Sequence, residues 1–315
     1  MKKASSKPLR VLITGATGLL GTHLLLTKPE NVEVYATLHQ YRKTLKSPSV
    51  SYVDLDVRDE KAVARVVQEL HPDVIIHTAA HGRVDYCEQH QEDAYATNVK
   101  ATKTLVDQAK SVNARIFFCS TNMTFDGMNP PYAEDSEQKP ASYYGKNKVE
   151  AETYIRASGV NFTIFRLMTM YGWNWQPARK NMISMLIEKL SLGEKLWMTN
   201  DVWNNLLFAR EAAAIYWYAV QHPELSNRET FQLAGKDRVN RFQATMAACE
   251  VFDLKKSLVA EVTSDYFKGQ EVARSPDTTF DTTKAERVLH FKPLDLLSGL
   301  EHMKLNRLPT SYETR

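Results

Sequence analysis

The stretch RVLITGATGLLG at residues 10–21 decides the fold. It opens with a short apolar run typical of a buried strand, and residues 19–26 continue as a helix. Between them, Gly15 permits a sharp turn, Gly18 lets the backbone approach a pyrophosphate, and Gly21 lets the helix pack close to the strand. The helix N-terminus offers N–H groups and a positive dipole end to phosphates. A plain tight turn is the alternative, but the position directly after the first strand favours a dinucleotide site.

The first half of the chain alternates between short apolar runs and helical patterns. This alternation predicts βαβ units and a parallel sheet covered on both faces, so the fold class is α/β, a Rossmann-type doubly wound sheet. Strands are expected at 10–14, 33–38, 51–54, 74–78, 115–120 and 162–167, and helices at 19–26, 60–70, 94–112 and 142–158.

The pattern loosens after residue 171. We expect residues 1–171 to form the dinucleotide-binding domain, with a return segment at about 206–235 that adds a strand at 230–234. Helices are expected at 182–192 and 209–220, and the chain from 241 onward reads as mostly helical. Residues 172–205 and 236–315 are then expected to form a smaller, discontinuous C-terminal substrate lobe.

Composition excludes several classes of protein. The 315 residues are 43% hydrophobic and 24% charged, which is ordinary for a globular protein. The net charge of +3 is too small to indicate a nucleic-acid partner. Cys87, Cys119 and Cys249 form no CxxC pair, so neither a metal site nor a disulfide framework is expected. The start of the chain lacks an apolar signal-peptide core, and no apolar run is long enough for a membrane span, so a cytoplasmic protein is expected.

The end of the second strand indicates which cofactor binds. NAD-binding proteins usually place an acid there for the ribose hydroxyls, but residues 37–43 read TLHQYRK. His39, Arg42 or Lys43 can meet a 2′-phosphate, which favours NADPH, with NADH as the alternative cofactor and a solvated basic loop as the structural alternative. Asp56 and Val57, after the third strand, stand where a carboxylate holds the adenine amino group.

The acid next to this adenine position has a structural interpretation of its own. Asp59 follows Asp56 by three residues and immediately precedes the helix expected at 60–70. It can equally serve as the N-cap of that helix.

Tyr144 and Lys148 form a YxxxK motif on a predicted helix. A spacing of four puts the phenol and the ammonium on one face, a turn apart. A free tyrosine has a pKa near ~10, and a nearby ammonium and an oxidised nicotinamide are expected to lower it. Tyr144 can then give a proton to a developing alkoxide. Tyr143 does not fit, because the residue four positions later is Asn147.

Thr121 lies at the end of the fifth strand, in the sequence Ser120-Thr121-Asn122. The carboxyl ends of parallel strands are where α/β proteins place their sites. The Thr121 hydroxyl can therefore hydrogen-bond a substrate carbonyl, and simple capping of the strand end is the structural alternative.

Several ordered motifs resemble the extended short-chain dehydrogenases/reductases, and within them the dTDP-4-dehydrorhamnose reductase group. The resemblance runs nearly end to end. The matching segments are TGATGLLG at 14–21, DVIIHTAA at 73–80, VDYCE at 84–88, STNMTFDG at 120–127, YGKNKVEAE at 144–152, RLMTMYG at 166–172, RSP at 274–276 and DTTKA at 281–285.

The resemblance implies roles position by position. Thr121, Tyr144 and Lys148 are implied to be catalytic, and Asn98 to support the site through the backbone. Lys148 is also implied to hold the nicotinamide ribose. With Gly21, His39 and Arg42 added from the residue-level reading, the expected cofactor-binding residues are Gly15, Thr17, Gly18, Leu19, Leu20, Gly21, His39, Arg42, Asp56, Val57, Ala79, Ala80, Asn98, Tyr144 and Lys148.

The chain departs from the group around the sugar. Asn122 and Met123 replace an acid and an aromatic residue, and Thr169 stands at the position of a pocket tryptophan. Arg210 stands where an aspartate is usual. Basic and aromatic residues beyond 171 are candidates to hold a nucleotide, with surface charge or core packing as the alternative for each. The expected substrate-binding residues are Asn122, Met123, Thr169, Arg179 and Trp203, and further candidates are Trp173, Trp175 and Lys180.

The residues favour simple carbonyl reduction over related reactions. Sugar 4,6-dehydratases carry an acidic pair after the strand-five Ser/Thr, and Asn122-Met123 cannot replace it. Epimerases usually keep the strand-two acid, which is missing here, although a sugar-nucleotide epimerase stays an alternative. The resemblance implies an NADPH-dependent reductase of a nucleotide-activated 4-keto-6-deoxy sugar that forms a homodimer. A non-catalytic regulatory subunit, like the β subunit of methionine adenosyltransferase, is the alternative from another functional class.

Overall fold

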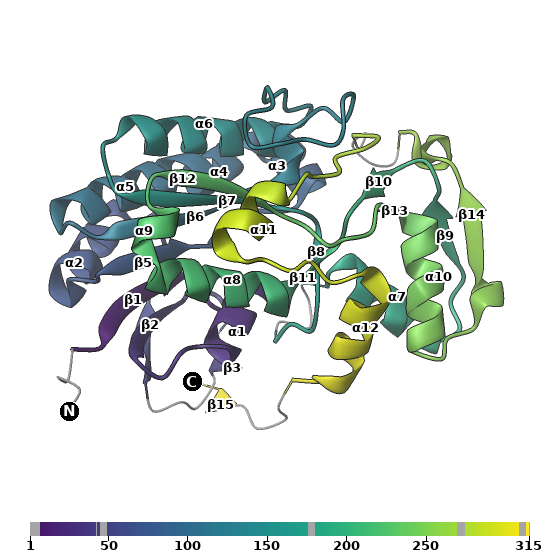
Figure 1. The fold of residues 1–315 in the computed structure, drawn as a ribbon, viewed down its shortest axis with the longest axis horizontal. Coiled ribbons are helices and arrows are strands. Elements are labelled where there is room, and N and C mark those ends of the chain that lie inside the picture. Colours follow the sequence, from purple (N-terminus) through teal and green to yellow (C-terminus); the bar gives the residue numbers. More distant parts are fainter. Residues whose placement is uncertain are drawn as a thin grey trace.

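The computed structural model describes residues 7–41, 43–44, 49–175, 180–269, 275–308 and 313–314 of the chain (Figure 1). Two predicted site residues, Arg42 and Arg179, lie outside these described residues. Arg274, which belongs to one of the matching segments, lies outside them as well.

A seven-stranded parallel sheet forms the centre of the larger part of the molecule, in the order β12-β7-β6-β5-β1-β2-β4. This confirms the predicted Rossmann-type α/β fold. The strand order reverses between β1 and β5, and such a switch point opens a crevice at the carboxyl ends of the two strands. The strands are β1 (Leu9–Thr14), β2 (Val32–Leu38), β4 (Val50–Asp54), β5 (Val74–His77), β6 (Arg115–Thr121), β7 (Phe162–Leu167) and β12 (Glu229–Leu233).

Helices cover both faces of this sheet. On one face, α1 (Leu19–Leu26) packs on α8 (Ala209–Gln221), and their apolar residues join Val11, Ile13 and Phe231 in one hydrophobic core. On the other face, α2 (Glu60–Leu70), α5 (Ala101–Ser111) and α6 (Tyr143–Ala157) enclose a second core. The predicted amphipathic face of 60–70 is confirmed, because Val63, Val66 and Val67 are buried there.

The helix expected at 94–112 is interrupted in its first turns. The structure has α4 (Gln91–Tyr95), then a π-helical turn η1 (Ala96–Lys100), and only then α5. A single π-turn inside a helical run is a local distortion that often marks a functional position. Asn98 lies in this π-turn.

The C-terminal part gathers around a third hydrophobic core, at the right of Figure 1. There α7 (Met182–Ser191), α10 (Arg241–Val251) and α12 (Leu296–Leu305) pack with β9 (Leu196–Thr199) and β14 (Val259–Val262), which pair in parallel. A mostly helical stretch after 241 was expected, and β14 corrects that expectation. The strand forms because β9 offers it a pairing partner about 60 residues earlier in the chain, which local pattern does not reveal.

Short elements complete the described chain. None of its helices is long and apolar enough to span a lipid bilayer. The short elements are β3 (Lys43–Thr44), α3 (Val84–Gln89), η2 (Asn122–Thr124), β8 (Met170–Tyr171), β10 (Trp203–Asn204), β11 (Leu207–Phe208), α9 (Pro223–Ser226), β13 (Val239–Asn240), η3 (Lys256–Leu258), η4 (Ser264–Phe267), α11 (Thr283–Leu289) and β15 (Glu313–Thr314).

A buried carboxyl group connects the larger part to the segment before α12. The Glu211 side chain, in the first turn of α8, accepts a hydrogen bond of 2.9 Å from the backbone N–H of Leu294. Its second oxygen is buried without a hydrogen-bond partner. Burial raises the pKa of Glu211 to about 7. Glu211, and not its half-buried neighbour Arg210, is the side chain that α8 turns into this junction.

We expect the Glu211→Gln variant to have a larger free energy of unfolding than wild type, and we expect this gain to be larger at pH 8 than at pH 5. An ordinary glutamate has a pKa of about 4.3, so between that pH and 7 the folded state holds a proton that the unfolded state has released. Wild-type stability therefore falls as the pH rises through this window, by an amount on the order of 1–3 kcal/mol. The glutamine side chain of the variant does not titrate and still offers an oxygen to Leu294.

Calorimetric melting temperatures of both proteins between pH 4.5 and 8 measure this difference. Glu301→Gln, a substitution of an exposed glutamate on α12, is the matched control and should show no such pH-dependent gain. A constant offset between Glu211→Gln and wild type across the range would contradict the assignment.

Candidate active site

The glycine turn lies directly against the end of β5. Gly15 adopts a left-handed backbone with φ of 70°, and a Cβ at this position would lie 2.6 Å from the backbone nitrogen of Ala79. The N–H of Gly18 donates to the carbonyl of Gly15 over 2.9 Å, which closes the turn. A Cβ on Gly21 would lie 2.5 Å from that same carbonyl oxygen. A side chain at either position would collide with backbone atoms, so Gly15 and Gly21 must both be glycine, as the sequence predicted.

The start of α1 is built to receive an anion. Gly18 is its N-cap and provides no side-chain hydrogen bond to the first turn, which also contains no acidic residue. Thr17 and Leu20 are buried and Leu19 is half-buried. N–H groups without side-chain caps and the positive end of the helix dipole suit a pyrophosphate. The residues present thus fit a dinucleotide.

At the adenine position, Asp56 is already engaged by a neighbour. Its carboxylate accepts hydrogen bonds from Arg58 Nε at 3.0 Å and Nη2 at 2.7 Å, and these bonds hold the pKa of Asp56 below its usual range. His39, exposed at the end of β2, places Nε2 3.8 Å from the same carboxylate, and Val57 is buried. Asp59 caps α2 by accepting from the N–H of Ala62, which confirms the capping alternative for that residue.

Lys148 lies one turn after Tyr144 on α6, and both face the end of β6. The Lys148 side chain is buried, donates to the carbonyl of Cys119 over 2.7 Å, and places Nζ 6.0 Å from the centre of the Tyr144 ring. Burial lowers the pKa of Lys148. The predicted pair therefore shares one face, as the spacing required.

The protein groups around Tyr144 shift its pKa in the direction opposite to the one expected from Lys148, and the expected influence of an oxidised nicotinamide stays a prediction. Burial raises the pKa of Tyr144 well above its ordinary value, and a hydrogen bond with Thr121 offsets only part of this rise. The reason is that Lys148 directs a hydrogen bond to Cys119, while the phenol lies in a poorly solvated position. Tyr144 is a protonated phenol at neutral pH, as an ordinary tyrosine is, and the shift makes it a weaker acid.

Thr121 has the capping role that the sequence left open as an alternative, and its hydrogen bond to a substrate carbonyl stays a prediction. Its hydroxyl oxygen accepts from the N–H of Met123 at 3.2 Å, so it caps η2 at the strand end. The same side chain hydrogen-bonds Tyr144. The structure thus brings Thr121, Tyr144 and Lys148 together.

Asn98 acts through the backbone of the loop that follows β5. Its side-chain oxygen accepts from the N–H of His81 at 2.9 Å, and its amide group donates to the carbonyl of His81 at 3.1 Å. This loop begins with the half-buried Ala79 and Ala80, and a Cβ on Gly82 would lie 4.0 Å from the Tyr144 hydroxyl. The Asn98 amide group therefore holds the loop beside Tyr144 through these two hydrogen bonds.

The expected substrate-binding residues in the described chain differ in their burial and in their contacts. Asn122 is buried and donates to the Thr278 hydroxyl at 2.7 Å, so it ties β6 to the C-terminal part. Met123 is half-buried and Thr169 is exposed, and both stay candidates. Trp203 is half-buried beneath the guanidinium of Arg238, 4.0 Å from the ring centre.

Three further candidates have structural roles. Trp175 is buried in the hydrophobic core of the larger part. Trp173 donates to the carbonyl of Met303 over 2.7 Å, and Lys180 pairs with Glu188. The core-packing and surface-charge alternatives therefore account for these side chains.

Sequence reasoning missed a buried ion pair between α6 and β7. Glu152, on α6, has no exposed side-chain surface and pairs with Arg166 on β7 at 2.9 Å. It also accepts a hydrogen bond from the Ser120 hydroxyl. Burial alone raises the pKa of Glu152, but Arg166 outweighs it and holds that pKa below the usual value. The signal was present, because Glu152 and Arg166 are in the matching segments 144–152 and 166–172.

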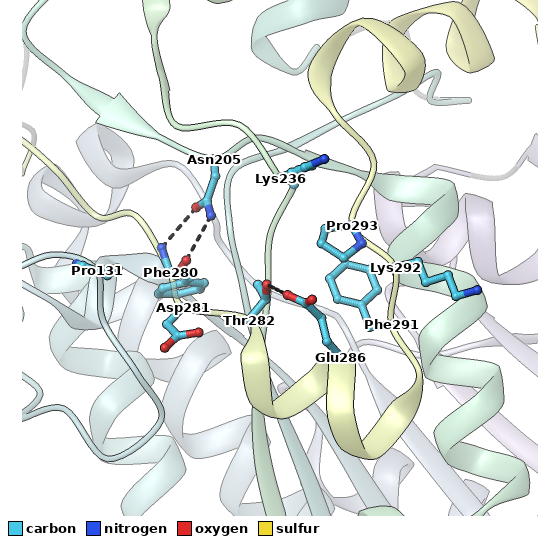
Figure 2. A pocket seen from close by; sticks show the side chains of 11 residues that line it. Pro131, Asn205, Lys236, Phe280, Asp281, Thr282, Glu286, Phe291, Lys292 and Pro293 are labelled. Carbon is cyan, nitrogen blue, oxygen red and sulfur yellow. Dashed lines mark hydrogen bonds between the residues drawn. The ribbon is translucent and has the colours of Figure 1, made fainter.

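The structure also has a hollow with a volume of about 490 Å³ (Figure 2). Its polar groups satisfy one another: Asn205 bonds the backbone of Phe280, and Thr282 donates to Glu286. None of the predicted site residues in the described chain lines it. The lining residues are Pro131, Asn205, Gly235, Lys236, Phe280, Asp281, Thr282, Glu286, Phe291, Lys292 and Pro293.

Comparisons with known proteins agree with this geometry. A family model described as RmlD substrate binding domain matches residues 9–307. Methionine adenosyltransferase 2 subunit beta of Danio rerio is 30% identical over 265 residues, which cover 81% of this chain and 77% of the relative. A dTDP-4-dehydrorhamnose reductase of Sinorhizobium fredii is 28% identical over 178 residues, which cover 56% of each protein.

A solved structure supports the fold. The dTDP-4-dehydrorhamnose reductase of Bacillus anthracis, in complex with NADP, superposes with a TM-score of 0.82. The alignment covers 94% of this chain and 99% of that chain at 22% sequence identity. At this identity the likeness concerns the fold alone.

We expect Gly21→Ala to weaken NADPH binding at least about tenfold. The added methyl group would lie 2.5 Å from the Gly15 carbonyl, so the glycine turn must move away from the pyrophosphate position. Fluorescence titration with NADPH, and in parallel with NADH, measures the change.

Gly193→Ala is the control, since a Cβ there meets nothing within 4 Å. Its φ of 79° makes alanine strained, so the control should lower the melting temperature and leave the dissociation constant unchanged. Equal affinity of Gly21→Ala and wild type would show that this turn does not hold the cofactor.

Proposed function

This chain belongs to the RmlD substrate binding domain family, within the extended short-chain dehydrogenases/reductases, and we propose that it is an NADPH-dependent reductase of a nucleotide-activated 4-keto-6-deoxy sugar. One observation carries the proposal. Thr121, Tyr144 and Lys148 meet at the carboxyl ends of the strands, beside a glycine turn that fits a dinucleotide.

Two parts of the site would hold the cofactor. The backbone N–H groups in the first turn of α1 would receive the pyrophosphate, and the Lys148 ammonium would hold the nicotinamide ribose. When bound, the reduced nicotinamide supplies a hydride to the substrate carbonyl carbon. The lack of an acid at the end of β2, where His39 is exposed, supports NADPH over NADH.

Tyr144 supplies the proton of the reduction. The phenol is protonated at neutral pH, as in an ordinary tyrosine, so it can hydrogen-bond the carbonyl oxygen and then protonate it as the alcohol forms. The Thr121 hydroxyl turns to the same oxygen and polarises the carbonyl. To stabilise the resulting phenolate, the Lys148 ammonium must leave the carbonyl of Cys119 and turn toward the ring, whose centre lies 6.0 Å from Nζ, before solvent returns a proton.

The sugar nucleotide is proposed to lie between this site and the smaller C-terminal lobe. Thr169 is exposed near the end of β7, and Arg238 stacks on Trp203 while pairing with Asp277 at 2.7 Å. Asp277 belongs to the same segment as Thr278, which Asn122 ties to the catalytic strand. A planar aromatic ring with a cation is suited to a nucleotide base and its phosphates. Relatives described as dTDP-4-dehydrorhamnose reductases support this substrate class.

A second function has an observation in its favour. The methionine adenosyltransferase 2 subunit beta relatives match over four-fifths of this chain, whereas the Sinorhizobium reductase matches 56% of it. The altered residues Asn122, Met123 and Thr169 suit a chain that binds a dinucleotide and serves as a partner subunit. The homodimer that the family resemblance implies stays a prediction.

We expect Tyr144→Phe to lower turnover at least about 10³-fold while NADPH affinity stays within about twofold of wild type. Phenylalanine keeps the ring in place and removes only the proton donor. The assay is oxidation of NADPH with a dTDP- or GDP-linked 4-keto-6-deoxyhexose, together with titration of the cofactor.

Tyr143→Phe, one residue earlier on α6, is the matched control and should retain turnover. Unchanged turnover in Tyr144→Phe contradicts the mechanism. Tight NADPH binding by wild type without turnover of any nucleotide 4-ketosugar favours the partner-subunit function instead.

A further inference from the structure

His77, the last residue of β5, is a buried histidine with partners at both ring nitrogens. Its side chain is 1% exposed. Nδ1 lies 2.7 Å from the hydroxyl of Thr14, the residue before the glycine turn. Nε2 lies 3.0 Å from the hydroxyl of Thr102 on α5. The proposed mechanism gives this imidazole no role.

The direction of each hydrogen bond in this chain can be derived. Thr102 donates its only hydroxyl proton to the carbonyl of Asn98 over 2.8 Å, so its oxygen can only accept from His77 Nε2. Burial lowers the pKa of His77 to about 3, which keeps the ring neutral. A neutral ring with its proton on Nε2 must accept at Nδ1, so the Thr14 hydroxyl donates there.

One end of the chain reaches the glycine turn. The Thr14 oxygen, having donated to His77, faces the N–H of Ala79 at 3.5 Å. The Thr14 carbonyl accepts from the hydroxyl of Thr78 at 2.8 Å. Because Gly15 lies against Ala79, the position of Thr14 sets how the turn rests on the end of β5.

The other end reaches the loop beside the catalytic tyrosine. The carbonyl that receives the Thr102 proton belongs to Asn98, in the π-turn η1. The side chain of Asn98 holds the backbone of His81 with two hydrogen bonds, next to Gly82 and the Tyr144 hydroxyl. A single imidazole thus connects the pyrophosphate end of the proposed cofactor site to its nicotinamide end.

We propose that His77 is a positioning residue. Its neutral Nε2–H imidazole fixes the position of the glycine turn relative to the loop after β5 that contains His81, so that both ends of the dinucleotide are bound together. This inference rests on the proposed cofactor site. His77 itself contacts only protein groups, and its effect on the cofactor passes through its hydrogen bonds to Thr14 and to Thr102.

Two amide substitutions separate the hydrogen bond to Thr14 from the hydrogen bond to Thr102. In His77→Asn, the side-chain oxygen reaches the Nδ1 position and can accept from Thr14, but nothing reaches Thr102. In His77→Gln, the longer amide reaches the Nε2 position and can donate to Thr102, but the contact with Thr14 is lost. A lost buried hydrogen bond corresponds to an affinity change of about five- to tenfold when it is expressed in binding.

The expected results differ between two ligands. ADP, with or without the 2′-phosphate according to the preferred dinucleotide, carries the diphosphate but neither the nicotinamide nor its ribose, so it reports the pyrophosphate end alone. His77→Asn should bind this fragment within about twofold of wild type and bind the full dinucleotide about tenfold more weakly. His77→Gln should weaken both ligands about tenfold. Nitrogen-15 NMR of wild type should show His77 as the Nε2–H tautomer.

Thr163→Val is the control for a merely structural effect. It removes a buried hydroxyl that donates to the carbonyl of Ser226, away from the chain through His77. It should lower the melting temperature and leave both affinities unchanged.

The outcomes separate this proposal from the proposed function. Wild type that binds no nicotinamide dinucleotide overturns both. If wild type binds the dinucleotide normally, two results overturn only the role of His77. One is an Nδ1–H tautomer. The other is that the two amide variants lose affinity for both ligands equally, or lose none.

Discussion

The close approach of the glycine turn to the end of β5 is the constraint on which the site depends. The turn can rest on Ala79 only because Gly15 has no side chain, and α1 can begin where it does only because Gly21 has none. This contact places the N-terminus of α1 over the crevice between β1 and β5. Every other part of the proposed cofactor site is arranged relative to that crevice.

Buried polar groups hold the surrounding elements at fixed positions. Glu152 joins α6 to β6 through Ser120 and to β7 through Arg166, directly beneath the catalytic residues. A buried carboxylate of this kind must be paired, because an unpaired charge away from water is costly. The orientation of the helix that presents Tyr144 and Lys148 is therefore fixed by electrostatics as well as by apolar packing.

Burial also decides the chemistry at the tyrosine. In water a lysine one turn away would favour the phenolate, but Lys148 is itself buried and directs its ammonium to the Cys119 carbonyl. Desolvation then dominates and raises the pKa of Tyr144. Tyr144 is therefore protonated at neutral pH, and the protonated phenol is the form that the proposed carbonyl reduction uses.

Local sequence determined the strands, the glycine turn and the YxxxK face, because each follows from spacing along a single element. The π-turn at Asn98, the strand at 259–262 and the buried Glu152–Arg166 pair were decided by tertiary structure. So was the direction in which the protein groups shift the Tyr144 pKa, since desolvation there outweighs the influence expected from Lys148. These features depend on which distant groups meet and on how much water is excluded where they meet. Periodicity along one chain specifies neither of these, since contact and solvation are properties of the packed molecule.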